Sequence, residues 1–348
     1  MPERRGALPG PGATVVRNRR TVAEERRAAI LGNHLRQMRA LITGGSGFLG
    51  SYLCRRLASA GWDMFVAATS RAGEHRLQDL KIARFLLVDV RDWSRIRQLV
   101  AEVPCEVVFH IAGQGRGDQP HDLIATNVQG TAHVLDAVAE VCPRARVIVV
   151  GSSAEYGDQG SRPIRENQVP NPRGTYAVSK WCQTILSLDA ANRGLDVQVA
   201  RLFNLIGQEQ STSYVLGSLT HQFRLMRQTG RPSAIRLGRT DTVRDFIDVR
   251  DVADALVRLA ESGRSGEVYN VASGTGRTIA QCIETLVRLT GIRPKLEVAP
   301  ELVRPDDVLV SVADNTKIHA DTGWVPARSF DQSLADCLAV PDATNEVA

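Results

Sequence analysis

The stretch that decides the fold is Gly44-Gly45-Ser46-Gly47-Phe48-Leu49-Gly50, which lies between an apolar run at 40–43 and a helical pattern at 48–60. A Gly-x-x-Gly-x-x-Gly turn between a strand and a helix is typical of a dinucleotide site. Gly44 would allow a tight turn, Gly47 the approach of a pyrophosphate, and Gly50 close packing of the helix. The phosphates would meet N–H groups at the positive end of the helix. An ordinary glycine-rich loop is the alternative. The predicted cofactor contacts here are Gly44, Ser46, Gly47, Phe48 and Leu49.

Apolar strands alternate with helices through the first two hundred residues. The strands are expected at 40–43, 65–68, 85–88, 107–111, 147–150 and 197–200, and the helices at 48–60, 120–141 and 174–193. Near-continuous apolar strands separated by helices predict a parallel sheet buried on both faces, which is an α/β fold of the Rossmann type, doubly wound.

The regular alternation ends after residue 201, and long irregular stretches follow at 207–216, 239–246 and 299–309. Loops of this length in a compact protein are usually functional. We therefore predict a dinucleotide-binding domain over 38–202, to which 243–262 returns. A smaller C-terminal substrate-binding lobe is expected over 203–242 and 263–340, with a tail at 341–348.

Composition excludes several classes of protein. Of the 348 residues 43% are apolar and 23% charged, which is close to the globular average. No apolar run is long enough for a transmembrane helix or a secretory signal, so we expect a cytoplasmic protein with no membrane partner. The six cysteines are scattered, which predicts neither a disulfide nor a metal site.

The net charge of +5 comes entirely from the first 37 residues, which hold eight Arg and three Glu. The rest of the chain is neutral and lacks the broad basic face that nucleic-acid binding requires, so we exclude a nucleic-acid partner. Residues 1–37 are expected to be a mobile basic extension without a catalytic role.

The end of the second strand, Ala68-Thr69-Ser70-Arg71, bears on the choice of cofactor. It lacks the carboxylate that usually binds the ribose hydroxyls of NAD, whereas Arg71 and its neighbours suit a 2′-phosphate. This favours NADP, with NAD as the alternative and a solvated surface role as the alternative for Arg71. Asp89 and Val90, after the third strand, are placed to meet the adenine, although Asp89 could equally cap a helix.

Tyr176-x-x-x-Lys180 is the most specific catalytic pattern, because four residues on a helix put both side chains on one face. An ammonium beside a phenol favours the phenolate, and lowering a pKa from about 10 toward 7 requires about 4 kcal/mol. Such a tyrosine can exchange a proton with a carbonyl or carbinol near neutral pH. Both residues would also contact the cofactor. The alternative is a surface pair with no chemistry.

Gly151-Ser152-Ser153-Ala154-Glu155-Tyr156-Gly157 follows the fifth strand, at the edge where doubly wound sheets bind ligands. We predict that Ser153 hydrogen-bonds the substrate oxygen that Tyr176 protonates. Ser152 is the second candidate, although it could instead cap the turn. Glu155 is predicted to contact substrate, as a catalytic acid, or to be a structural carboxylate that binds turn N–H groups.

These residues resemble the extended short-chain dehydrogenase/reductases that act on nucleotide sugars. The resemblance covers about residues 38–340 and also includes the stretches Thr126-Asn127-Val128-x-Gly130-Thr131, Arg201-x-Phe203-Asn204 and Arg244-Asp245-Phe246-Ile247-Asp248-Val249-x-Asp251. It implies cofactor contacts at Ala112 and Asn127 and a homodimer.

Further segments resemble the GDP-4-keto-6-deoxy-D-mannose reductases, which form GDP-D-rhamnose. They include Pro163-Ile164-Arg165-Glu166, Arg304-Pro305-x-Asp307-Val308 and Thr322-Gly323-Trp324-x-Pro326. The resemblance implies that a GDP-linked nucleotide sugar is bound by Asn204, Arg244, Arg304 and Asp307. Alternatively, each Arg pairs internally and Asp307 caps a turn. The loop Leu205-Ile206-Gly207-Gln208 departs from the usual pattern, which puts the exact sugar in doubt.

The expected activity is therefore reduction of the C4 keto group of a GDP-4-keto-6-deoxyhexose by NAD(P)H. The alternative is a GDP-sugar or other NDP-sugar epimerase, or a 4,6-dehydratase, which keeps its NAD(P) bound and recycles it. A dehydratase needs a second acid to expel the C6 hydroxyl, and only Ala154-Glu155 follows the serines.

Overall fold

The structure is a computed structural model that describes residues 38–115, 119–303 and 307–339. The expectations for residues 1–37, for the tail at 341–348 and for Arg304 lie outside the described residues. In the described part of the chain, no helix is long and apolar enough to cross a membrane.

A sheet of seven parallel strands forms the centre of the fold, in the order β10-β6-β5-β4-β1-β2-β3. Six strands match the expected ones to within a few residues, and β10 joins them at one edge. Their bounds are β1 (Arg39–Thr43), β2 (Asp63–Ala68), β3 (Arg84–Leu87), β4 (Val107–His110), β5 (Arg146–Ser152), β6 (Asp196–Leu202) and β10 (Val268–Val271).

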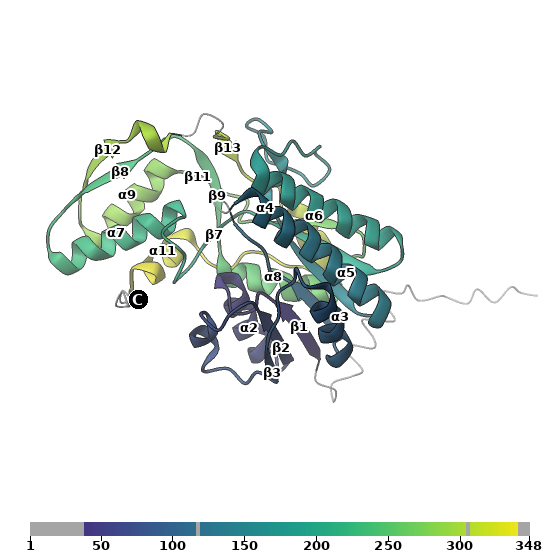
Figure 1. The fold of residues 1–348 in the computed structure, drawn as a ribbon. Coiled ribbons are helices and arrows are strands. Elements are labelled where there is room, and N and C mark those ends of the chain that lie inside the picture. The colour runs from purple at the N-terminus through teal and green to yellow at the C-terminus, as the bar shows by residue number, and fades with distance from the viewer. Residues whose placement is uncertain (1–37, 116–118, 304–306, 340–348) are drawn as a thin grey trace, which may run out of the picture. The chain divides into compact units, whose positions relative to one another are not determined.

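Helices cover both faces of this sheet, so the prediction of a doubly wound fold is confirmed (Figure 1). Ile42 and Val66 point to α2 (Phe48–Ser59) and α8 (Val249–Ser262), with α10 (Thr316–Thr322) beyond them. Leu41 and Ala67 point the other way, to α3 (Trp93–Glu102), α5 (Gly130–Val141) and α6 (Gly174–Asn192). Because side chains alternate along a strand, apolar residues at successive positions fill both cores.

The helix expected over 120–141 is divided in three. α4 (Pro120–Leu123) passes into a π-helical segment, η2 (Ile124–Gln129), before α5 begins. Such π-helical turns occur mostly as single turns inside helices, frequently at functional sites. Asn127 lies in this segment and is completely buried.

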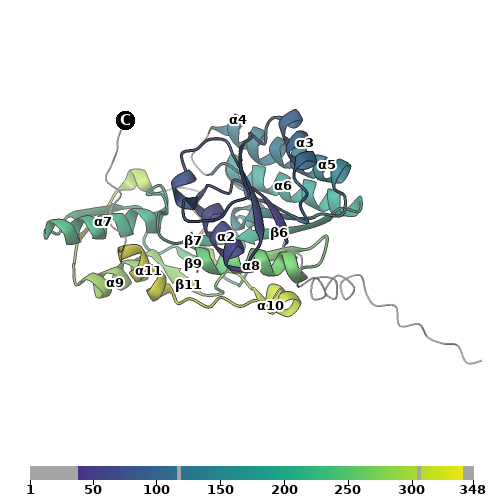
Figure 2. The ribbon, with the colours of Figure 1, turned by 90° about the horizontal axis from the view of Figure 1, so that it is seen from below.

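Most of the remaining elements form a second group with its own core, seen apart from the sheet in Figures 1 and 2. Phe223, Leu286 and Leu334, from three different helices, are buried together there. Its elements are β7 (Asn204–Ile206), α7 (Val215–Thr229), β8 (Ala234–Leu237), β9 (Val243–Asp248), β11 (Gly276–Thr278), α9 (Ile279–Thr290), β12 (Lys295–Val298), η4 (Pro300–Leu302), β13 (Val310–Ser311) and α11 (Phe330–Ala339).

The structure corrects the expected division of the chain between the two parts. β9 was expected with the dinucleotide-binding domain but pairs with β7, β11 and β13 of the lobe. β10 was expected in the lobe but pairs with β6 in the central sheet. A short apolar run such as 268–271 fits either sheet, because its periodicity does not identify the neighbouring strand.

The glycine-rich turn shows why small residues are required at two of its positions. Gly44 has a φ of +73°, in the left-handed region that favours glycine. A Cβ on Gly50 would lie 2.2 Å from the Gly44 carbonyl oxygen, whereas one on Gly47 would lie 3.2 Å from it. The first turn of α2 therefore packs directly against the turn.

We predict that Gly50→Ala lowers the free energy of unfolding by about 1–3 kcal/mol, because the new methyl group overlaps a backbone carbonyl. Gly47→Ala is the matched control and should cost clearly less. Urea unfolding followed by circular dichroism measures both. Equal losses in the two variants would contradict the close contact at Gly50.

Candidate active site

The glycine-rich turn leaves the start of α2 open to a ligand. The N-cap residue is Gly47, no side chain of the described residues caps the helix, and its first turn has no acidic residue. The unpaired N–H groups and positive end of a helix in this state suit a phosphate. The turn therefore fits the pyrophosphate of a dinucleotide, with glycine backbone where side chains would obstruct it.

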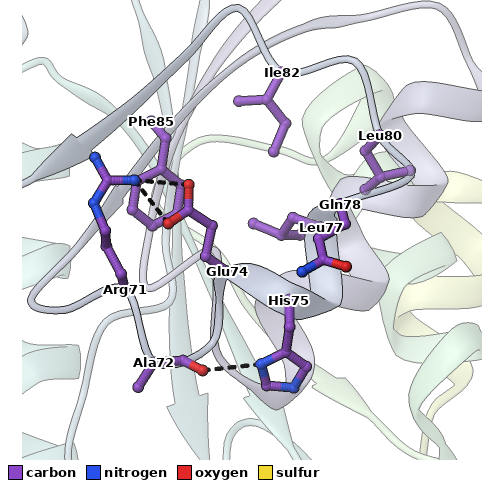
Figure 3. Close-up of a pocket in the computed structure, with 9 residues that line it drawn as sticks. All are labelled: Arg71, Ala72, Glu74, His75, Leu77, Gln78, Leu80, Ile82 and Phe85. Atoms are coloured by element: carbon purple, nitrogen blue, oxygen red, sulfur yellow. Dashed lines mark hydrogen bonds and ion pairs between the residues drawn. The ribbon is translucent and has the colours of Figure 1, made fainter.

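Arg71 lies beyond the end of β2, on a loop that packs against this turn. A Cβ on Gly73 would lie 2.2 Å from the Ser46 carbonyl oxygen, to which Arg76 donates at 3.3 Å. Arg71 pairs with Glu74 at 2.7 Å and lies over the Phe85 ring, beside a pocket of about 650 Å³ (Figure 3). Because the Arg71 side chain is 62% exposed, this pair contributes little stability and leaves the guanidinium available to a phosphate.

Asp89 is held by Arg91, which donates to it from its main-chain N–H and from its guanidinium, the latter at 2.7 Å. Hydrogen bonds from Arg91 lower the pKa of Asp89. The N-cap of α3 is Asp92, so the alternative that Asp89 caps this helix is wrong. Val90 is buried against Gly130 of α5.

Ala112 lies in the loop after β4, and Asn127 of η2 contacts this loop. The Ala112 N–H donates to the Thr43 carbonyl at 3.0 Å, which ties the β4 loop to β1. The Asn127 side chain accepts from the Gln114 N–H at 2.8 Å and donates to the Ser179 hydroxyl at 3.0 Å. Asn127 thus links the loop after β4 to α6, and its contact with a cofactor stays a prediction.

Ser153 and Ser152 have different surroundings in η3 (Ser153–Tyr156). Ser152 is the N-cap, and its hydroxyl accepts from the Ala154 N–H at 3.2 Å. The Ser153 hydroxyl has no hydrogen-bond partner within the described ranges and is half-buried. This geometry favours Ser153 over Ser152 as the residue that meets a substrate oxygen.

Tyr176 and Lys180 lie on the first two turns of α6, which packs against η3. The Lys180 ammonium is buried and donates to the Val150 carbonyl oxygen at 2.6 Å and to Gln183 Oε1. Burial lowers the pKa of Lys180 to about 8, and the charge of Glu155 acts in the opposite direction. Lys180 is therefore charged at pH 7, and its charge is weakly screened.

A chain of buried polar groups that the sequence reasoning missed continues behind Lys180. Gln183 Nε2 donates to the Thr131 hydroxyl at 2.8 Å, and that hydroxyl donates to the Asn127 carbonyl oxygen at 2.6 Å. His110 Nε2 lies 2.9 Å from the same hydroxyl. It must donate to this hydroxyl, because the Thr131 proton is already donated to Asn127. His110 Nδ1 then accepts from Thr43 at 2.8 Å.

Burial and, to a smaller extent, the nearby charge of Lys180 together lower the pKa of His110 to about 3, so this histidine is neutral. All the groups that link the Lys180 ammonium to β1 are therefore uncharged. One signal in the sequence was available: Gln183 stands three residues after Lys180, on the same face of the helix.

The prediction that Glu155 contacts substrate does not agree with the structure. Its side chain is completely buried, pairs with Arg201 at 2.8 Å and accepts from the Ser152 N–H at 2.8 Å. The alternative role as a structural carboxylate that binds turn N–H groups fits these contacts. A carboxylate enclosed in this way has no path to a substrate.

Two of the residues expected to bind nucleotide lie together in the lobe. Arg244 Nη2 donates to Asp307 at 2.7 Å, and Asn204 donates to the Asp245 carbonyl oxygen at 3.1 Å. Parallel pairing of β13 with β9 brings the two segments side by side. The internal pairing that was the alternative for Arg244 is therefore present.

A doubly wound parallel sheet, a glycine-rich turn after β1 and a Tyr-x-x-x-Lys helix beside the end of β5 define an enzyme of the short-chain dehydrogenase/reductase type. The chain belongs to the NAD-dependent epimerase/dehydratase family, which it matches over residues 40–272. This confirms the resemblance seen in the sequence and the expectation of an NAD(P) cofactor.

Individual relatives agree with this assignment. The chain is 31% identical to a GDP-6-deoxy-D-mannose reductase of Pseudomonas aeruginosa over 310 residues, 86% of this chain and 96% of the relative. It is 29% identical to a UDP-glucose 4-epimerase of Streptomyces lividans, over 87% of this chain and 94% of that protein. The structure of RMD from Pseudomonas aeruginosa complexed with NADPH superimposes with a TM-score of 0.76 at 30% identity, covering 87% of this chain and 96% of that one.

We predict that Tyr176→Phe lowers turnover by about 10²- to 10⁴-fold, the range for a lost general acid, while the protein remains folded. Steady-state kinetics and thermal unfolding measure the two effects. Tyr269→Phe is the control, since its hydroxyl contacts Arg264 and Asp321 instead of the site, and should affect stability alone. Full activity in Tyr176→Phe would remove this residue from the mechanism.

Proposed function

We propose that this protein reduces the C4 carbonyl of a GDP-linked 4-keto-6-deoxyhexose with NAD(P)H. The observation that carries the proposal is the placement of the Ser153 hydroxyl beside the helix that carries Tyr176 and the buried Lys180 ammonium. The similarity to a GDP-6-deoxy-D-mannose reductase over most of both chains supports the GDP-linked substrate.

When bound, NAD(P)H would supply the hydride for C4 in this mechanism. The Ser153 hydroxyl donates a hydrogen bond to the carbonyl oxygen, and Tyr176 gives that oxygen its proton, so an alcohol forms. Lys180 stabilises the phenolate that remains and binds the nicotinamide ribose. Because Lys180 is buried, its charge acts on the phenol in a medium of low dielectric constant.

The nucleotide is assigned to the lobe. Arginine suits a diphosphate, and a carboxylate can accept from the N–H groups of guanine. Arg244 Nη2 lies 2.7 Å from Asp307 Oδ1, so a single bound GDP can contact both side chains. Asn204 lies close by, where it donates to the Asp245 carbonyl oxygen. Arg304 is assigned to the same group from the sequence.

The alternatives are epimerisation and dehydration with a recycled cofactor. Glu155 is the acidic residue of η3, and its burial against Arg201 argues against a 4,6-dehydratase that takes its second acid from this turn. An epimerase stays the second candidate, since the UDP-glucose 4-epimerase of Streptomyces lividans is similar over most of its length.

We predict that the purified protein exchanges its cofactor freely and oxidises NADPH, followed at 340 nm, when GDP-4-keto-6-deoxymannose is added. UDP-glucose, under the same conditions, should give no oxidation. Analysis of the nucleotide released by acid denaturation is the second measurement. Oxidised cofactor that persists through purification, together with no NADPH consumption, would identify an epimerase or a dehydratase.

We further propose that NADP is preferred to NAD, through Arg71. A charged hydrogen-bonded pair of this kind is worth about 1–3 kcal/mol, so the preference should be roughly 5- to 150-fold. Arg71→Ala should weaken NADPH binding and leave NADH nearly unchanged, as measured by cofactor fluorescence titration. Arg84→Ala, another exposed arginine in a surface pair, is the control. A loss of affinity for both cofactors would show that Arg71 does not bind the 2′-phosphate.

Homodimerisation and a cytoplasmic location stay predictions from the sequence. Sedimentation of the purified chain at several concentrations tests the first of them.

A further inference from the structure

The Glu155 carboxylate contacts three elements of the fold at once. One oxygen accepts from the Ser152 N–H of the turn at 2.8 Å. The other accepts from the Thr184 hydroxyl of α6 at 2.8 Å and from Arg201 Nε of β6 at 2.8 Å. Thr184 stands one helical turn after Lys180. A single buried side chain thus joins the turn of Ser153 to the helix of Tyr176 and Lys180.

Arg201 joins the same two elements through its other contacts. Its guanidinium lies 4.6 Å from the ring centroid of Tyr156, in the turn, and 5.4 Å from that of Trp181, which is next to Lys180. The Arg201 side chain is 2% exposed. Its Nη1 has no hydrogen-bond partner among the residues that the structure describes.

Burial of the Glu155–Arg201 ion pair restricts a neighbouring residue and costs desolvation energy. A Cβ on Gly151 would lie 2.7 Å from Glu155 Oε1, so the second-last residue of β5 must be glycine to admit the carboxylate. Burying an ion pair costs desolvation energy that the attraction often fails to recover, and apolar replacements are frequently as stable. The pair is therefore better explained by the geometry it imposes than by stability.

We propose that Glu155, together with Arg201, is a positioning residue that fixes the Ser153 hydroxyl relative to Tyr176 and Lys180. This inference rests on the proposed roles of those three residues. Proton transfer requires both hydroxyl groups within hydrogen-bond reach of one substrate oxygen, and a misplacement of about 1 Å can cost about 10²-fold in rate. The two hydroxyl groups come from different elements, η3 and α6, and Glu155 and Arg201 each contact residues of both regions.

The charge of Glu155 has a second consequence that can be measured. The titratable groups around Lys180 are Glu155 on η3, His110 on β4 and Tyr176 on the same helix, and Glu155 in turn faces Arg201 and Tyr156. Burial raises the pKa of Glu155, and the Arg201 charge and the Ser152 and Thr184 hydrogen bonds oppose this shift. His110 is neutral above a pH of about 3, and the Glu155 carboxylate raises the pKa of Lys180 against the effect of burial.

Glu155→Gln is the direct test. The amide retains the size of the side chain but cannot accept from Ser152, Thr184 and Arg201 together. We expect kcat to fall roughly 10- to 100-fold, with KM and NADPH affinity changed less than about threefold. Lys180 loses its proton as the pH rises through about 8, so activity should decline above this pH. Without the Glu155 charge the pKa of Lys180 falls further, and the decline should begin at lower pH.

Two further variants separate the effect of the Glu155 charge from the effect of its side-chain length, and they control for unfolding. Glu155→Asp keeps the charge but shortens the side chain, so kcat should fall while the pH profile stays close to that of the wild type. The double variant Glu155→Gln, Arg201→Met leaves no buried charge without a partner and should regain stability. Its kcat should stay low and its alkaline decline should stay at lower pH.

Asp196→Asn is the matched control. Asp196 of β6 pairs with Arg146 of β5 at 3.1 Å, at the opposite end of these strands from Glu155 and Arg201. This variant should lose comparable stability and retain the wild-type kcat and pH profile. Glu155→Gln with wild-type kcat and pH profile would overturn the proposal, and so would an equal loss of kcat in Asp196→Asn. If Tyr176→Phe is also fully active, the proposed function fails instead.

Discussion

The contact between the Gly44 carbonyl and the first turn of α2 is the constraint on which the rest of the site depends. A Cβ on Gly50 would lie 2.2 Å from that oxygen, and one on Gly44 would lie 2.7 Å from the Ala112 nitrogen. Because these positions lack side chains, β1, the start of α2 and the loop after β4 come within van der Waals contact. The carboxyl ends of parallel strands meet at one edge, so β5 and β6 deliver η3 and Arg201 to the same place.

The polar groups behind this edge are almost all satisfied inside the protein. Lys180 donates to a main-chain carbonyl and to Gln183, and the chain continues through Thr131 to a neutral His110. A buried ammonium with a pKa of about 8 requires such a network, because an unsatisfied charge in this position would destabilise the fold. The chemistry and the packing of the site therefore depend on the same contacts.

Two acidic residues of β9 and α8 act as structural contacts. Asp245 accepts from the N–H groups of Ser273 and Gly274 at 2.9 Å, and Asp251 accepts from Arg328 at 2.6 Å. These carboxylates belong to the stretch that resembles nucleotide-sugar enzymes, yet each is buried and joins distant segments of chain. Asp245 keeps β9 in place, and β9 carries Arg244 beside Asp307.

The sequence by itself determined the doubly wound sheet, the glycine-rich turn and the placement of Tyr176 and Lys180 on one helix, because each depends on residues close together in the chain. Strand periodicity, the small size of Gly50 and the four-residue helical spacing are local properties. Only the tertiary structure decided that Glu155 is enclosed by Arg201 and Thr184, that β10 completes the central sheet, and that Gln183 and His110 support Lys180. These contacts join residues from separate elements, and a buried carboxylate and an exposed one look the same in sequence, since burial is set by the neighbours that the fold supplies.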